Sequence, residues 1–265
     1  MIPNTNLSVL ADRLRLHAVR MVPPHGLGYL GPVLSSAEMF AALYGRHYDP
    51  GTDKIVVSPG HYIIAAFAAA AEIGILDQDV LASYGHDNSV LEAIGTEKSP
   101  AVDLTGGSLG QGLSGAVGLA LSQRLRKESG GRVFAILSDG ELEEGQVWEA
   151  AMFAAHNELN NIIVLLDAND SQVDGPVSEI TTIEPITDKW RSFGWAAFDV
   201  DGHDVDAVDA ALNAAIEIDQ PAVVIGRTST VHGLSVLPDG ADGHFIKLPR
   251  ELAEAAIAEL EARLA

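Results

Sequence analysis

Short runs of consecutive apolar residues alternate along the chain with longer segments of helical pattern. The clearest runs are residues 133–137, 162–166, 196–200 and 222–226. Strands that are apolar at consecutive positions are typical of parallel sheets, whose crossover helices cover both faces. The pattern therefore predicts an α/β fold, a doubly wound parallel sheet with helices on both faces.

The chain contains no fixed-period repeat and no linker rich in Pro, Gly or Ser, so residues 1–265 are expected to form a single domain. Apolar positions among Glu and Arg predict an amphipathic C-terminal helix at about 249–265. The most apolar run, 63–76, is interrupted by Glu72 and is shorter than the roughly 20 residues of a membrane span. It predicts a buried helix, and no membrane association is expected.

Acidic residues outnumber basic ones by 37 to 16, which gives a formal net charge of −21. This balance argues against binding nucleic acid or anionic membranes, because both need a basic surface. An anionic ligand would need a metal cation, a helix N-terminus or histidines to offset the repulsion. Cysteine is absent and the N-terminal residues do not form a secretory signal, so we expect a cytoplasmic protein.

Polar residues follow two of the predicted strands. Ser138-Asp-Gly-Glu141 comes directly after one strand and Asp167-Ala-Asn-Asp-Ser171 after the next, so that Asn169 follows Asp139 by 30 residues. This is the length of a strand end, a crossover helix and another strand, which places both residues at the carboxyl edge of the sheet, where α/β folds bind ligands. Carboxylate and amide oxygens suit Mg²⁺ or Ca²⁺. Taken singly, the same dipeptides are also ordinary turn formers.

Position by position, the two segments resemble the thiamine-diphosphate motif, in which an Asp-Gly pair is followed about thirty residues later by Asn. The stretch from Ser138 to His156 resembles the transketolase family in particular, as does Val173-Asp-Gly175. Further blocks resemble the family in its own order: Ser58-Pro-Gly-His61, Thr105-Gly-Gly-Ser-Leu-Gly-Gln-Gly112 and Asp199-Val-Asp-Gly-His-Asp204. The blocks cover nearly the whole chain, so turn formation alone does not explain them.

The resemblance implies thiamine diphosphate as the cofactor, together with Mg²⁺ or Ca²⁺. Asp139, Asn169 and the carbonyl group of Ser171 would hold the metal. Gly140 and Glu141, inside the same motif, are expected among the cofactor-binding residues.

Other positions of the resemblance carry expected roles around this metal. His61 and His244 would approach the diphosphate or the substrate and take part in catalysis, although a lone histidine such as His61 is more often structural. Backbone groups of Gly107 and Leu109 would contact the aminopyrimidine. Glu144 matches a family glutamate in a carboxylate network at the subunit interface, and it equally fits a charge that complements a helix N-terminus.

A complete transketolase of the usual kind continues into a pyrimidine-binding domain and a C-terminal domain, and this chain does not. The resemblance therefore implies a second subunit that carries both, an α2β2 heterotetramer, and exposed hydrophobic surface on the isolated chain. The expected reaction transfers a two-carbon ketol unit between small carbonyl substrates, from a ketose-type donor to an aldehyde.

The stretch before Leu34-Ser-Ser-Ala-Glu-Met39 departs from the family pattern. Alignment places Tyr29 where the family has a catalytic histidine, and His25 lies four residues earlier. Either Tyr29 acts as the proton donor, or His25 substitutes for the histidine, or the acceptor is not a sugar phosphate. Thr230-Val-His-Gly-Leu-Ser235 lacks the basic residues of the family's Lys-Gly-Lys-Gly-Val-Ser stretch, and Asp242-Gly-His244 stands where the family has Asp-Trp-His.

Alternative functions remain open at this point. A split carboligase, or a subunit of a 2-oxoacid decarboxylase or dehydrogenase of the E1 type, would share the metal motif and act on a 2-oxoacid. A catalytically silent binding module is disfavoured because Asp139, Gly140 and Asn169 are all present. A nicotinamide-binding Rossmann enzyme is disfavoured because the glycines of 106–112 lack the fingerprint spacing after a strand.

Overall fold

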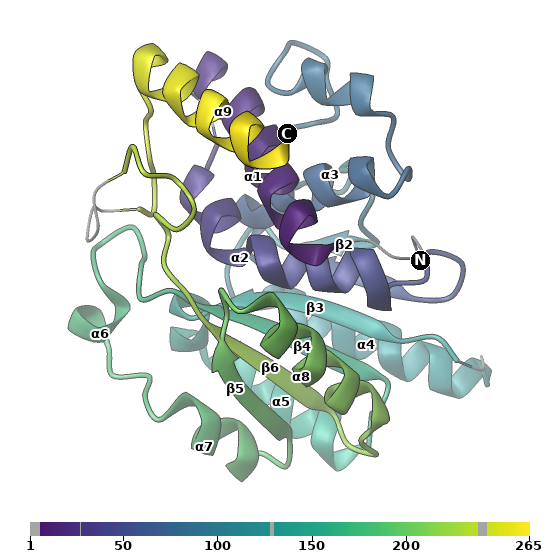
Figure 1. Cartoon of the computed structure of the whole chain (residues 1–265). Helices are drawn as coiled ribbons and strands as arrows, with labels where there is room; N and C mark the ends of the chain where they lie inside the picture. Colours follow the sequence, from purple (N-terminus) through teal and green to yellow (C-terminus); the bar gives the residue numbers. More distant parts are fainter. Residues whose placement is uncertain (1–5, 27, 128–129, 238–242) are drawn as a thin grey trace.

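The computed structural model describes residues 6–26, 28–127, 130–237 and 243–265. Within these ranges the strands form one six-stranded parallel sheet in the order β2-β1-β3-β4-β6-β5 (Figure 1). The strands are β1 (Lys54–Val57), β2 (Leu104–Thr105), β3 (Val133–Ser138), β4 (Ile162–Ala168), β5 (Ala196–Asp201) and β6 (Ala222–Arg227). The predicted doubly wound α/β fold is confirmed.

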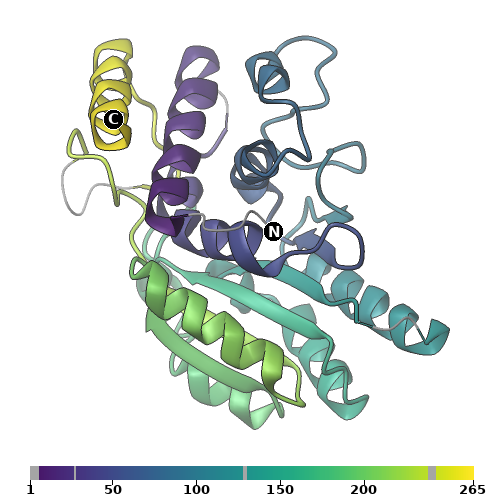
Figure 2. The same ribbon diagram turned by 45° about the vertical axis from the view of Figure 1, so that its right-hand side comes forward.

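Helices cover both faces of the sheet. The α-helices are α1 (Leu7–His25), α2 (Leu30–Ala42), α3 (Ile63–Glu72), α4 (Gln111–Arg126), α5 (Gly145–His156), α6 (Val177–Ile180), α7 (Ile186–Ser192), α8 (Val205–Glu217) and α9 (Arg250–Leu264). The short helices are η1 (Leu43–His47), η2 (Gly60–Tyr62), η3 (Gln78–Ser83) and η4 (Gly140–Glu143). Figures 1 and 2 show α1, α2, α3 and α9 stacked on one side of the sheet and α4 and α5 on the other.

The central strands are apolar at consecutive positions because their side chains alternate between two cores. Along β3, Phe134 and Ile136 pack with α1, α2 and α3, whereas Ala135 and Leu137 pack with α4 and α5. The same alternation holds along β4. A strand buried on both faces needs apolar side chains on both, which explains why the sequence pattern was readable.

Local sequence signals explain several helix positions. Asn6 caps α1 by accepting hydrogen bonds from the amides of Ser8 and Val9 at 3.1 and 3.2 Å. Gly26 ends that helix with a left-handed φ of 61°. The apolar run 63–76 contains α3, whose residues up to Ala71 are all buried, as predicted. The C-terminal helix is α9, within the range expected for it.

The strands β1 and β2 were not predicted from the sequence. These strands span four and two residues, and Leu104 in β2 is exposed. Both are recognisable in the structure because β1 pairs in register with β2 on one side and with β3 on the other.

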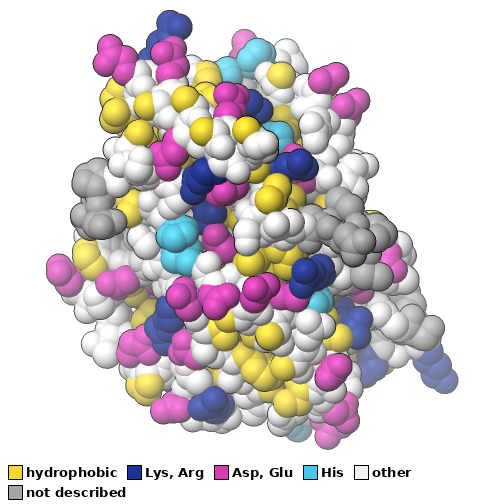
Figure 3. Space-filling model, viewed as in Figure 1, with side chains coloured by type: hydrophobic (Ala, Val, Ile, Leu, Met, Phe, Trp, Pro, Cys, Tyr) yellow, Lys and Arg dark blue, Asp and Glu magenta, His cyan; other side chains and the backbone are white. Residues whose placement is uncertain are grey.

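The surface agrees with the acidic composition. On the face seen in Figure 3, acidic side chains are spread widely and basic ones lie among them without gathering into one patch. None of the helices in the described ranges combines the length and the apolar character that a membrane span requires.

Candidate active site

The carboxyl ends of the strands bring most of the predicted site residues to one edge of the sheet. His61 follows β1, Gly107 follows β2, Asp139 follows β3 and Asn169 follows β4. Because β3 and β4 pair directly, with Ser138 beside Asp167, the loops that begin at Asp139 and Asn169 are neighbours. The predicted convergence of the two motif segments is therefore confirmed.

Asp139 is held by backbone donors from both loops. One carboxylate oxygen accepts from the amide of Gly140 at 2.8 Å and the other from the amide of Asp170 at 2.6 Å. Asn169 Oδ1 accepts from the amide of Ser171 at 2.9 Å, which folds Ser171 back toward the same corner. Each of these oxygens keeps a lone pair that a hard cation can use.

Electrostatics favour a cation at this corner. Asp139 is only 2% exposed, and burial together with the neighbouring Asp167 raises its pKa to about 7. Within the described ranges, neither carboxylate forms an ion pair with a basic side chain. Two adjacent buried carboxyl groups without a positive partner are costly. A divalent ion bound to Asp139 and Asn169 would remove that cost, so the donor set fits Mg²⁺ or Ca²⁺.

Asp167 is a site residue that the sequence analysis missed. Its Oδ2 accepts hydrogen bonds from Ser35 Oγ at 2.5 Å, Tyr62 OH at 2.7 Å and Asn169 Nδ2 at 2.9 Å, while Oδ1 accepts from Thr228 Oγ1. With its amide nitrogen turned toward Asp167, Asn169 presents Oδ1 on the opposite side, toward Ser171. The available signal was a charged residue inside the otherwise apolar strand β4.

Tyr29, His61 and His244 form an aromatic cluster beside this corner. The ring of Tyr29 lies 5.0 Å from that of His61 and 5.4 Å from that of His244, and the two histidine rings are 5.4 Å apart. Tyr62, next to His61 in the chain, also donates to Asp167. Tyr62 thus connects the aromatic cluster to the metal corner, the candidate metal site formed by Asp139, Asn169 and Ser171, because Asp167 also accepts from Asn169.

His25 lies in a different cluster. Its ring packs against His86 at 5.0 Å and Tyr84 at 6.2 Å. Of the two candidates for the missing family histidine, Tyr29 is the one in ring contact with His61 and His244. Asp242, the first residue of the Asp-Gly-His block, lies outside the described residues.

The remaining predicted residues differ in exposure. Gly107 is exposed and Leu109 is half-buried, in the loop between β2 and α4. Glu144 is exposed at the N-terminus of α5, where its side chain makes no capping bond. Glu141 is completely buried, and its Oε1 accepts from the amide of Gly110 at 2.7 Å and from Ser58 Oγ.

Burial lowers the pKa of His61 to about 3, with a smaller contribution from His244, so its imidazole is neutral at physiological pH. Between pH 6.5 and about 3 the unfolded chain binds a proton that the folded chain rejects. Stability therefore falls as the pH is lowered through this window.

We expect the unfolding free energy of His61→Gln to depend less steeply on pH than that of the wild type, by up to about 1.4 kcal/mol per pH unit. Urea unfolding between pH 7.5 and 4.5 measures the two slopes, and equal slopes would contradict a half-buried His61 that stays neutral.

A second group of potential metal ligands does not suit a metal. Atoms of Glu38, His203 and His232 approach within 4.8 Å of one another. However, His203 Nε2 accepts from the amide of Ser229 at 2.8 Å, so Nδ1 carries the proton and faces Glu38. The two imidazoles are stacked 3.6 Å apart at 14°, which keeps their lone pairs in separate planes. Instead, His203 holds the loop after β6 in place through its hydrogen bond from Ser229 and its stacking on His232.

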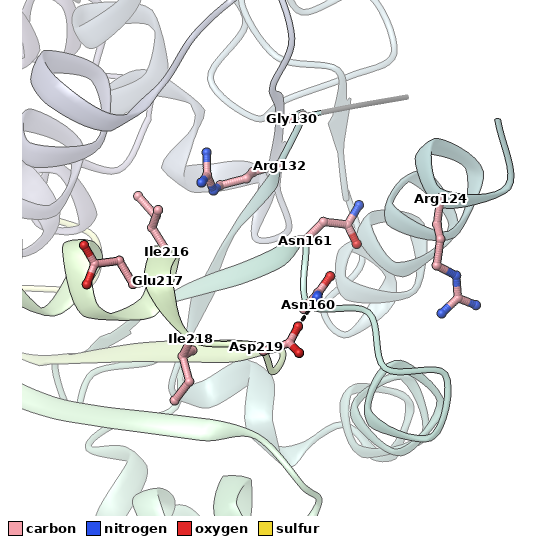
Figure 4. Close-up of a pocket in the computed structure, with 10 residues that line it drawn as sticks. Arg124, Gly130, Arg132, Asn160, Asn161, Ile216, Glu217, Ile218 and Asp219 are labelled. Atoms are coloured by element: carbon pink, nitrogen blue, oxygen red, sulfur yellow. Dashed lines mark hydrogen bonds between the residues drawn. The ribbon is translucent and has the colours of Figure 1, made fainter. Parts of the chain in front are cut away.

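A hollow of about 400 Å³ lies at the opposite edge of the sheet, at the amino ends of β3, β4 and β6 (Figure 4). Glu217 and Asp219 line it together with Arg124 and Arg132, so charges of both signs are balanced there. We assign it no part in the site at the carboxyl edge.

Comparison with known proteins agrees with this fold. The sequence model of the transketolase thiamine-diphosphate-binding domain matches residues 7–260. This match assigns the α/β domain, with its candidate metal site at the carboxyl edge, to the class of thiamine-diphosphate-binding domains. The chain belongs to the transketolase family.

Several relatives illustrate the extent of the match. A transketolase family protein of Sinorhizobium fredii is 40% identical, with 95% of this chain and 94% of that protein aligned. The subunit SqwG of a 6-deoxy-6-sulfo-D-fructose transketolase from a Clostridium strain is 37% identical, over 95% and 94%. Human transketolase is 31% identical over 96% of this chain, but this chain spans only 42% of it.

Solved structures give the same result for the fold. Transketolase from Leishmania mexicana superposes with a TM-score of 0.84 at 26% identity, over 98% of this chain and 41% of that one. Transketolase from Campylobacter jejuni superposes with a TM-score of 0.82 at 22% identity, over 97% and 47%. The chain therefore spans less than half the length of these two enzymes.

Proposed function

We propose that this chain binds thiamine diphosphate and Mg²⁺ at the carboxyl edge of its sheet and works as one half of a transketolase-like transferase. The observation that supports the proposal most is the pair of buried carboxyl groups, Asp139 and Asp167, without a basic partner among the described residues. A divalent cation would supply the missing charge, and a diphosphate would complete its coordination.

The residues would divide the work as follows. Asp139, Asn169 and the carbonyl of Ser171 would hold the metal, while Gly107 and Leu109 would offer backbone groups to the aminopyrimidine. When bound, the cofactor supplies the nucleophilic carbon and the electron sink that breaking and forming a C–C bond beside a carbonyl require.

Around the reacting carbonyl, the chain's own part is to donate hydrogen bonds and move protons. His61 is neutral and half-buried, so it can donate from one ring nitrogen and accept at the other. Tyr29, whose ring contacts both histidines, would donate a proton from its hydroxyl group in the role of the family's histidine.

Tyr29→Phe is expected to lower kcat/KM by about 10²-fold or more, because it removes the proton donor and keeps the ring packing. Binding of the cofactor should change less than threefold, which calorimetry measures beside steady-state kinetics. Tyr44→Phe is the matched control, since the Tyr44 hydroxyl is buried without a hydrogen-bond partner in the described structure. If Tyr29→Phe retains full activity, the ring serves only for packing.

We further propose that the other half of the active site comes from a second polypeptide, in an α2β2 assembly with this chain as a single domain. The chain matches almost the whole of the Clostridium subunit but only 42% of human transketolase. Met152 and Phe153 on α5 are exposed, at 51% and 46%, and the same helix begins beside Glu144. An apolar, partly acidic helix face of this kind suits a partner surface.

The substrates we propose are a ketose-type donor and an aldehyde acceptor. The relative that acts on a 6-deoxy-6-sulfo-D-fructose makes sulfonated ketoses worth testing beside phosphorylated ones. Tyr29 at the histidine position fits a second candidate equally well, carboligation from a 2-oxoacid. Incubating the chain and its partner with each donor separates the two, because two-carbon transfer releases no CO₂ and 2-oxoacid cleavage does.

A further inference from the structure

Three loops of the candidate site meet at one buried side chain, Glu141. Its Oε1 accepts from the amide of Gly110, at the start of α4, at 2.7 Å, and from Ser58 Oγ, directly after β1. Glu141 itself lies in η4, two residues after Asp139. It is 0% exposed, so no side-chain surface is left for a ligand.

Glycines lock these loops together. A Cβ on Gly112 would lie 2.4 Å from the Cβ of Ser58, and one on Gly106 would lie 2.5 Å from the carbonyl oxygen of Ser58. A Cβ on Gly60 would in turn lie 2.5 Å from the carbonyl oxygen of Gly106. The backbone around Ser58 therefore has little room to move. A hydrogen bond that fixes Ser58 also restricts the positions of the glycines packed against it.

We propose that Glu141 is a positioning residue, which fastens the loop of Gly107 and Leu109 to the loop of Asp139 through Ser58 and Gly110. The proposal rests on the proposed function, in which the first loop contacts the aminopyrimidine and the second holds the metal. Because Gly110 is one residue from Leu109 and three from Gly107, holding its amide fixes the backbone that would meet the ring.

One oxygen of Glu141 makes both bonds, and this gives the test a conservative rescue. The other oxygen, Oε2, is buried without a hydrogen-bond partner in the described structure. Glu141→Gln keeps an oxygen for Gly110 and Ser58 and places its NH₂ where Oε2 stood. Glu141→Met has a similar volume and removes the acceptor.

The first readout needs no cofactor. In the metal-free chain, hydrogen exchange of the segment 106–112 should rise about tenfold or more in Glu141→Met. The same segment should stay protected in Glu141→Gln. Equal protection in all three proteins, or equal loss in both variants, would overturn the proposal.

The second readout compares two ligands by calorimetry, with the partner subunit present where the wild type requires it. Glu141→Met should weaken Mg²⁺-dependent binding of thiamine diphosphate about tenfold or more and change that of inorganic pyrophosphate less than threefold, because pyrophosphate lacks the aminopyrimidine. Equal losses for both ligands would show a general structural role and overturn the proposal. If the wild type binds neither ligand, the proposed function fails, and hydrogen exchange still decides whether Glu141 holds the loop.

Discussion

Asp139→Asn is expected to weaken Mg²⁺-dependent binding of thiamine diphosphate by at least about 100-fold, because the variant loses the charged ligand of the metal corner. The variant should nevertheless fold. Asp139 is buried beside Asp167, and its pKa is raised to about 7 from an unfolded value of 3.8. Between these values the folded chain binds more protons, so stability without metal falls as the pH rises through this window.

The same charge that binds the metal therefore costs stability when no metal is present. At pH 8 with chelator, we expect Asp139→Asn to unfold within about 4 °C of the wild type, because loss of the buried charge offsets the one backbone hydrogen bond that the asparagine NH₂ group cannot accept. Adding Mg²⁺ and thiamine diphosphate should raise the midpoint of the wild type and leave that of the variant unchanged. Asp188→Ala removes an exposed carboxylate from α7 and serves as the control. A variant that binds the cofactor as tightly as the wild type would exclude Asp139 as a ligand.

Gly112→Ala is expected to destabilise the chain by about 1–3 kcal/mol and to weaken cofactor binding with it. The new Cβ would lie 2.4–2.5 Å from three atoms of Ser58, one of them the Cα, so backbone must move. Because Ser58 donates to Glu141, this movement reaches the loops of the site.

Gly118→Ala, in the same helix, is the matched control. A Cβ at Gly118 meets no atom within 4 Å, and alanine favours a helix interior, so a gain of up to about 1 kcal/mol is expected. Urea unfolding of both variants measures the difference. A neutral Gly112→Ala would mean that the packing around Ser58 is looser than described.

The sheet and the convergence of the two motif segments at its carboxyl edge could be predicted because their signals are local. β3, β4 and β6 are buried on both faces and therefore apolar throughout, and the residues after a parallel strand must lie at its carboxyl edge. That Asp139 and Asn169 lie close together follows from their positions after neighbouring strands. β1 and β2 were missed because strands of four and two residues hold too few positions to show a pattern.

Contacts between distant segments explain the rest of what the sequence did not reveal. Asp167 gains its role from Ser35, Tyr62 and Thr228, which lie on α2, η2 and the loop after β6. The choice between Tyr29 and His25 likewise depended on which ring the chain brings to His61. The spacing of residues along the chain predicts neither the contacts of Asp167 nor the contact of Tyr29 with His61, because both depend on how the helices pack on the sheet.

Calorimetric titration of thiamine diphosphate with Mg²⁺ into this chain, alone and with a candidate partner that carries a pyrimidine-binding domain, tests the central claim most directly. We predict binding that requires Mg²⁺ and tightens in the presence of the partner. Absence of binding under both conditions would contradict the account and return the chain to the class of catalytically silent modules.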